Sequence, residues 1–132
     1  MVFNVLMVDD SAITRALIRR SLTMADLPIT EIFEAPNGTV ALEQLRAHPI
    51  HLILVDLHMP EMNGIELAHA VLNNPAMKAI PLAIVSAEPS ATRIAELRKA
   101  GVKGYLRKPF TPESIRNLIK PFVEAQHVTV AE

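Results

Sequence analysis

The chain of 132 residues contains no cysteine. Disulfide bridges, cysteine-ligated zinc or iron–sulfur sites and thiol nucleophiles are therefore excluded. An excess of charge of one sign is also missing, because 13 basic residues face 14 acidic ones and the formal net charge is -1. This balance provides no strong field for nucleic acid or for an anionic membrane surface, so we expect no nucleic-acid partner.

The sequence also lacks long apolar runs and a basic N-terminal leader. No run approaches the roughly 18 apolar residues of a membrane-spanning helix, and the first acidic residue is Asp9. We therefore expect a cytoplasmic protein without membrane insertion. Hydrophobic residues make up 50% of the chain, which suffices for one ordinary globular domain and is too little for two.

Short apolar segments alternate with segments of helical periodicity, the pattern of a βαβ sheet. The predicted strands span residues 3–8, 31–35, 52–55, 82–86 and 104–107. The segments around Val5, Leu52 and Leu82 are continuously apolar and suit the centre of the sheet. The other two strands contain charged residues and suit its edges. The sequence thus predicts an α/β fold: a doubly wound, flavodoxin-like, five-stranded parallel sheet in the order 2-1-3-4-5, with five helices.

Several local signals predict where the helices begin and end. Gly101 suits the position just after the fourth helix, and Thr111-Pro112 suits the start of the last one. Pro121 falls inside the last helix and removes a backbone donor, so we expect a kink or an early end there. The predicted domain spans residues 1–123, followed by a frayed tail at 124–132.

Polar residues follow the ends of the predicted strands. Asp9 and Asp10 follow the first strand, Asp56 the third and Lys108 the fifth, while Ser86 ends the fourth. The carboxyl ends of parallel strands meet at one edge, where open α/β sheets bind ligands. The three aspartates repel one another without a counterion, and oxygen ligands of this kind favour Mg²⁺.

Such a pocket is suited to phosphoryl transfer. Lys108 can hold a phosphoryl oxygen as a point charge and Ser86 can donate a hydrogen bond to another. The Asp56 carboxylate can then act as the nucleophile. A purely structural interpretation is the alternative, because an Asp-Asp pair after a strand is often only a helix cap with a solvated neighbour. Arg15, on the first helix, is expected on a solvated face with Arg19 and Arg20.

Five motifs together resemble the receiver domains of two-component response regulators. They are VDDS at 8–11, EAPNG at 34–38, VDLHMPEMNGIEL at 55–67, VSAE at 85–88 and GYLRKPF at 104–110. Any one of these motifs is weak, but all five in order are a specific signal. The resemblance extends over residues 3–122 and is strongest to the single-domain receivers typified by the chemotaxis regulator.

The resemblance implies a role for each residue of the metal site. Asp56 corresponds to the phosphoacceptor and also binds Mg²⁺. Asp10 corresponds to a direct Mg²⁺ ligand and Asp9 to an acid that acts through metal-bound water. The backbone carbonyl of His58 completes the metal site. Lys108 corresponds to the family's lysine, and its peptide bond to the next proline is expected to be cis.

Further positions correspond to the family's switch and to its hydrolysis site. Ser86 and Tyr105 match the pair that moves on phosphorylation, which changes the face formed by the fourth helix, fifth strand and fifth helix. His58 and Glu88 flank the path of the water that hydrolyses the phosphoryl group. In the family, the position of His58 usually carries a smaller or more polar residue, so the resemblance does not predict the lifetime of the phosphoryl group in this chain.

The resemblance implies a signalling protein and not an enzyme, although it catalyses its own aspartyl phosphorylation and dephosphorylation. It would take a phosphoryl group from a histidine kinase or a histidine phosphotransfer protein. It would then control a downstream target protein or pass the phosphoryl group on, as a monomer or weak dimer. The alternatives are a Mg²⁺-dependent aspartyl-phosphate phosphatase, a receiver-like interaction module without phosphorylation, and a flavin-binding electron carrier on the same sheet.

Overall fold

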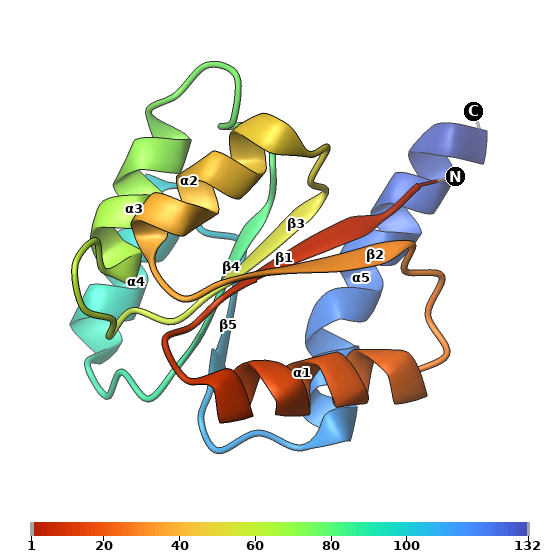
Figure 1. The fold of residues 1–132 in the computed structure, drawn as a ribbon, viewed down its shortest axis with the longest axis horizontal. Helices are drawn as coiled ribbons and strands as arrows, with labels where there is room; N and C mark the ends of the chain where they lie inside the picture. The colour runs from red at the N-terminus through yellow and green to blue at the C-terminus, as the bar shows by residue number, and fades with distance from the viewer. Residues whose placement is uncertain (1, 132) are drawn as a thin grey trace.

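A computed structural model describes residues 2–131 of the chain and the side chains of residues 2–126. Strands and helices alternate along its whole length (Figure 1). The strands are β1 (Asn4–Val8), β2 (Glu31–Ala35), β3 (Leu52–Val55), β4 (Leu82–Ser86) and β5 (Gly104–Arg107). The helices are α1 (Ala12–Met24), α2 (Gly38–Ala47), α3 (Gly64–Leu72), α4 (Ala91–Ala100) and α5 (Pro112–Ala131). Nine of the ten predicted strand ends are therefore confirmed, and β1 begins one residue later than predicted.

The strands form one parallel sheet in the order β2-β1-β3-β4-β5, as the sequence predicts. β1, β3 and β4 are buried along their whole length, whereas β2 and β5 are partly exposed. The two strands with charged residues, β2 and β5, are thus the edges, because an edge strand leaves charged side chains access to solvent. This arrangement is the predicted flavodoxin-like fold.

Helices cover both faces of the sheet. α2, α3 and α4 lie on one face, and α1 and α5 on the other (Figure 1). Each face has its own apolar core, which includes Leu67 and Leu97 on the first face and Ile18 and Ile115 on the second. Successive side chains of a strand point to opposite faces, so the continuously apolar central strands supply both cores.

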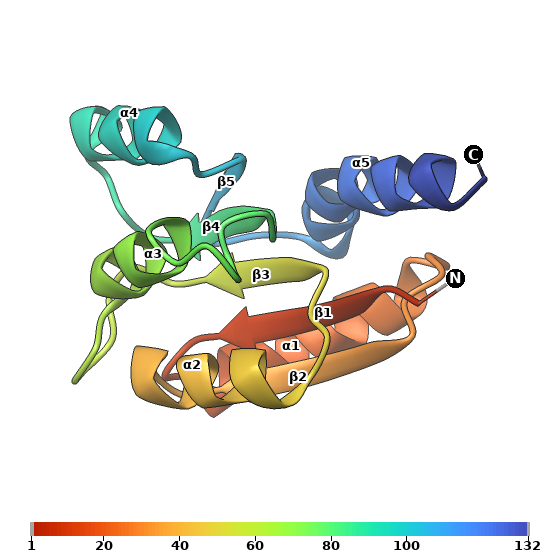
Figure 2. The same cartoon turned by 90° about the horizontal axis from the view of Figure 1, so that it is seen from above.

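The last helix differs from its prediction. A kink or an early end was expected at Pro121. The early end is wrong, because α5 continues through Pro121 to Ala131, and the kink stays a prediction. Val123 is buried on the sheet just beyond the proline, and this packing keeps the next turn helical despite one lost hydrogen bond. Figure 2 shows α5 running back toward the end of the sheet where β1 begins. The fraying expected for 124–132 stays a prediction.

Other predicted boundaries are confirmed. Gly101 follows α4 with φ of 128°, a conformation that favours glycine, and α5 begins at Pro112. The Lys108–Pro109 peptide bond is cis. Within the described part of the chain, the longest apolar helical stretch falls short of what a membrane crossing needs.

Candidate functional site

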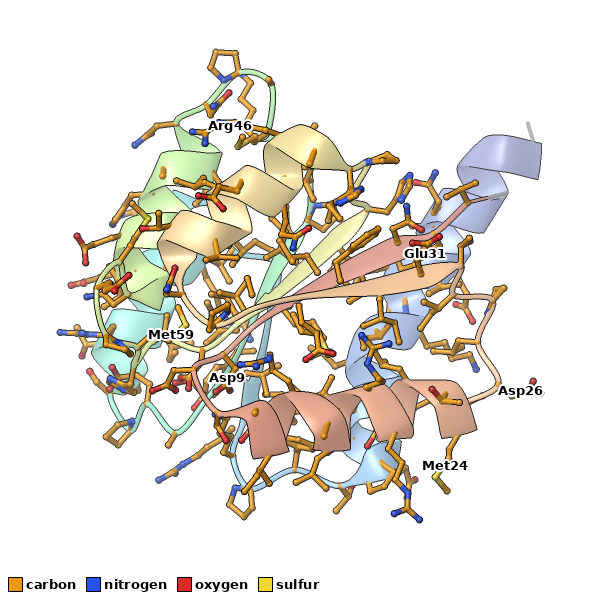
Figure 3. All side chains as sticks on the ribbon, viewed as in Figure 1. Asp9, Met24, Asp26, Glu31, Arg46 and Met59 are labelled. Atoms are coloured by element: carbon orange, nitrogen blue, oxygen red, sulfur yellow. The ribbon has the colours of Figure 1, made fainter. Side chains whose placement is uncertain are left out.

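Three aspartates meet at the carboxyl edge of the sheet. Val8, the last residue of β1, pairs with Val55, the last residue of β3, so the residues that follow leave the sheet side by side. Asp9 lies where β1 ends and the chain turns into α1 (Figure 3). Carboxylate oxygens of Asp9, Asp10 and Asp56 all lie within 4.8 Å of one another. Asp9 and Asp56 are buried and Asp10 is exposed, so one acid opens the site to solvent.

Lys108 links two of these acids. It follows β5 at the far edge of the sheet, and its Nζ lies 2.7 Å from Asp9 Oδ2 and 3.0 Å from Asp56 Oδ2. The lysine side chain is 21% exposed, and those of the two aspartates are 4% and 8% exposed. The sheet order therefore brings together a cation and two anions that lie 52 and 99 positions apart from it in the chain.

The other oxygen of Asp56 accepts two hydrogen bonds. Ser86 Oγ donates to Asp56 Oδ1 at 2.7 Å, and the backbone N–H of His58 donates to the same oxygen at 3.1 Å. Ser86 is completely buried, and its Oγ also accepts a 3.4 Å hydrogen bond from the N–H of Leu57. Both oxygens of Asp56 thus have donors that hold the carboxylate in one orientation.

These contacts decide the charge states of the site. Burial raises the pKa of the Asp9 carboxyl, and the hydrogen bonds from Lys108 and Ser11 offset only part of that effect. Burial acts in the same direction on Asp56, but the donors Ser86, His58 and Lys108 outweigh it and lower the pKa of Asp56. Burial also opposes the charge on Lys108, yet its two carboxylate partners raise the lysine pKa. Asp56 is therefore an anion and Lys108 a cation at neutral pH.

A divalent cation fits this set of donors. Three carboxylates and one ammonium leave two formal negative charges in the cluster. Burial of two of the acids makes this excess costly, and a divalent cation would balance it. The donors are all oxygen atoms, which suit a hard cation such as Mg²⁺.

Three further predicted residues, His58, Glu88 and Tyr105, are connected to one another through Glu88. Glu88 is buried, and its carboxylate Oε1 lies 3.6 Å from His58 Nε2 and 3.5 Å from Arg93 Nε. Tyr105 does not reach the acids; its hydroxyl donates a 2.8 Å hydrogen bond to the backbone carbonyl of Glu88. The His58 imidazole is turned to Glu88, and only the backbone of His58 contacts Asp56.

The sequence interpretation missed two supports of the site. An added Cβ at Gly64 would lie 2.1 Å from the backbone oxygen of Asp56, so only glycine lets α3 begin this close to the loop that follows β3. Arg15 is not on a solvated face as expected, because it pairs with Glu34 and donates to the backbone carbonyl of Asp9. The spacing of Arg15 and Arg19 along α1, opposite a glutamate on an edge strand, was the available signal.

Comparison with known proteins agrees with this geometry. Residues 5–120 match the profile of the response regulator receiver domain. The chain belongs to the response regulator receiver family. Receiver domains of this family serve two-component signalling, so the chain is not a member of a classical enzyme family.

Individual receivers match over most of their length. Chemotaxis protein CheY of Pseudomonas aeruginosa is 37% identical over 121 residues, which cover 92% of this chain and 96% of that protein. Chemotaxis protein CheY1 of Helicobacter pylori is 34% identical over 118 residues, with coverages of 89% and 94%. The structure of CheY4 of Vibrio cholerae superposes with a TM-score of 0.81 at 30% identity and covers 92% of this chain and 99% of that one. This receiver is therefore similar to single-domain chemotaxis receivers over nearly its whole length.

Proposed function

We propose that this receiver accepts a phosphoryl group on Asp56 and uses it to change its surface. The observation that carries the proposal is the environment of Asp56, an ionised carboxylate held by Ser86 and Lys108 among other acids. Aspartate is a known covalent acceptor in phosphoryl transfer, and that reaction depends mainly on positioning and on neutralisation of charge.

The donor is a phosphohistidine of a kinase or of a histidine phosphotransfer protein. An oxygen of Asp56 attacks the phosphorus, a C–O–P bond forms, the P–N bond breaks and the imidazole leaves with the bonding electron pair. Mg²⁺ held by Asp10, Asp56, the backbone carbonyl of His58 and, through water, Asp9 would neutralise the phosphoryl charge. The ammonium of Lys108 provides a further cation for the phosphoryl oxygens.

The attack requires Asp56 to give up existing bonds. Oδ1 accepts from Ser86 at 2.7 Å, and Oδ2 accepts from Lys108 at 3.0 Å, so neither oxygen is free as the site stands. After transfer, the phosphoryl group presents new acceptors just beyond the carboxylate. Ser86 and Lys108 then move their hydrogen bonds from Asp56 to the phosphoryl oxygens, which carry the larger negative charge.

This movement can reach the surface through the end of β4. Ser86 ends β4, and Glu88 lies two residues further along, where its backbone carbonyl accepts from Tyr105. A shift of Ser86 toward the phosphoryl group therefore disturbs the partner of Tyr105. A surface cavity of about 310 Å³ lies beside Tyr105, between α4 and β5, and its shape would change with the ring. This is the face that would bind a downstream target protein.

The lifetime of the phosphoryl group depends on the residues beside it. The contacts of His58 and Arg93 with the Glu88 carboxylate place three side chains next to the carboxyl edge of β3 and β4. We expect them to limit the access of hydrolytic water. A cytoplasmic location and a monomer or weak dimer complete the proposal.

The test is a labelling experiment on the full chain. With acetyl phosphate and Mg²⁺, the wild type should form a phosphoprotein that hydroxylamine cleaves, and Asp56→Asn should form none. Asp26→Asn is the matched control, because Asp26 is an exposed aspartate with φ of 56°, a conformation that asparagine tolerates. Label retained by Asp56→Asn would refute the assignment of the phosphoacceptor. No label on the wild type would favour the interaction module without phosphorylation.

A further inference from the structure

Arg15 connects the metal site to an edge strand. The side chain of Arg15 is 16% exposed and lies in the second turn of α1. One of its terminal nitrogens donates to the backbone carbonyl of Asp9, and its Nε donates to Glu34 Oε1 at 2.9 Å. The guanidinium thus bridges the loop that carries the acids and the end of β2.

Glu34 is itself held from the other side. Arg19 donates to Glu34 Oε2 from Nε at 2.9 Å and from a terminal nitrogen at 2.7 Å. That terminal nitrogen also donates to the backbone carbonyl of Ile32 at 2.9 Å. Burial opposes the charge on Glu34, but its hydrogen bonds with Arg19 and Arg15 outweigh burial and lower its pKa. Glu34 is therefore a fixed anion that keeps Arg15 in one position.

The bond to the Asp9 carbonyl determines the direction of Asp10. The carbonyl of Asp9 and the nitrogen of Asp10 belong to one planar peptide unit, so fixing the carbonyl fixes the course of the backbone into Asp10. Two more bonds hold Asp9: its N–H donates to the Ala35 carbonyl at 3.1 Å, and its Oδ1 accepts from the Ser11 N–H at 2.9 Å. Among the described residues, the Asp10 carboxylate has no hydrogen-bond or ion-pair partner, so its position depends on its backbone.

We propose that Arg15 is a positioning residue of the metal site: held by Glu34, it orients the peptide between Asp9 and Asp10 and thereby sets the affinity for Mg²⁺. The inference rests on the proposed function, because it assumes that Asp10 binds the ion. Arg15 acts through geometry, since it donates to the backbone carbonyl of Asp9 and its carboxylate partner is Glu34.

Glu34 has a second effect in this arrangement. An unpartnered guanidinium next to three carboxylates would be drawn toward the exposed acid, Asp10, and would compete there with the cation. The carboxylate of Glu34 holds Arg15 on the backbone side of the loop. Replacement of either Arg15 or Glu34 should therefore weaken Mg²⁺ binding.

The experiment measures Mg²⁺ binding to the full chain by isothermal titration calorimetry. We expect Arg15→Met to bind Mg²⁺ about tenfold more weakly than the wild type, the size typical for residues that orient metal ligands. Arg15→Lys should recover only part of the affinity, because one ammonium replaces a planar fork that bridges two acceptors. Arg20→Met is the control, since Arg20 is exposed on the same helix and makes no ion pair within the described chain.

Thermal denaturation of each variant separates stability from metal binding. A purely structural role predicts a lower melting temperature with unchanged Mg²⁺ affinity in the folded protein, and that result would overturn the inference. If Arg15→Met does not fold, Arg15→Lys and Glu34→Gln provide the same comparison. Failure of the wild type itself to bind Mg²⁺ would instead refute the metal site of the proposed function, and the inference with it.

Discussion

Replacement of Lys108 by methionine tests the charge balance at the centre of the site. Methionine keeps much of the length and apolar character of the lysine stem but removes the ammonium that contacts Asp9 and Asp56 at 2.7 and 3.0 Å. Two buried carboxylates then face each other, with Asp10 nearby and no cation between them. We expect the variant to lose stability in Mg²⁺-free buffer and to bind Mg²⁺ more tightly.

The size of the loss follows from the exposure of the partners. Removal of one member of a fully buried ion pair costs about 3–5 kcal/mol. Lys108 is 21% exposed, so solvent screens part of the interaction, and we expect about 2–3 kcal/mol. For a domain of this size, such a loss corresponds to a decrease in melting temperature of about 10 °C.

The effect on Mg²⁺ has the opposite sign. In the wild type, a bound ion would have to share Asp9 and Asp56 with the ammonium, whereas in the variant it would replace the missing positive charge. Relief of this competition should tighten binding about tenfold, which equals about 1.4 kcal/mol. Mg²⁺ in excess should then restore much of the lost melting temperature, because a ligand that binds only the folded state stabilises it.

The assay is thermal denaturation followed by circular dichroism, in EDTA and in a series of Mg²⁺ concentrations. Lys103→Met is the matched control, because Lys103 is an exposed lysine just before β5 without an ion pair in the described structure, and it should change neither quantity. A Lys108→Met variant that is as stable as the wild type in EDTA would show that the ion pairs contribute no net stability. A destabilised variant with unchanged or weaker Mg²⁺ binding would refute the competition between lysine and metal.

Three other predictions concern stability and the switch. Glu34→Gln should destabilise by less than about 1 kcal/mol at pH 7. The folded-state pKa of Glu34 is lowered from the ordinary value of 4.5, so in urea titrations the difference from wild type should shrink as the pH falls below 4.5 and vanish as the pH passes through the lower folded-state pKa. A difference that stays constant over this range would contradict the ion pairs. Gly64→Ala places a Cβ 2.1 Å from the Asp56 carbonyl, so urea denaturation should show a loss of about 3 kcal/mol in stability, and phosphorylation should be slower. Unchanged stability would show that the backbone shifts easily to accommodate the methyl group. Tyr105 is the one tyrosine in a chain without tryptophan, so acetyl phosphate with Mg²⁺ should change its fluorescence in the wild type but not in Ser86→Ala, and an equal change in both would exclude coupling through Ser86.

Much of the fold could be predicted because each element carries its own local signal. The short, continuously apolar segments indicated strands covered on both faces, and charged residues on the segments around Glu34 and Arg107 indicated the edges. Pro121 shows the limit of such reasoning. Its local effect is unfavourable to a helix, yet burial of Val123 against the sheet outweighs it, and this burial depends on distant strands.

The acids and the lysine of the site could also be anticipated, because strand ends in a parallel sheet share one edge. The hydrogen-bond partners within the site could not be anticipated from the sequence. Ser86 donates to Asp56 itself, Lys108 bridges two acids, and Tyr105 reaches the Glu88 backbone. These choices depend on distances set by the packing of four separate strands.

The sequence by itself determined the alternation of strands and helices, the central and edge strands, and the residue types available at the carboxyl edge. The reason is that periodicity, capping residues and turn residues act over a few neighbouring positions. Only the tertiary structure decided that Arg15 faces inward to Asp9 and Glu34, and that α3 can begin against Asp56 only with glycine at position 64. Those contacts join segments far apart in the chain, and their distances follow from how the helices pack on the twisted sheet.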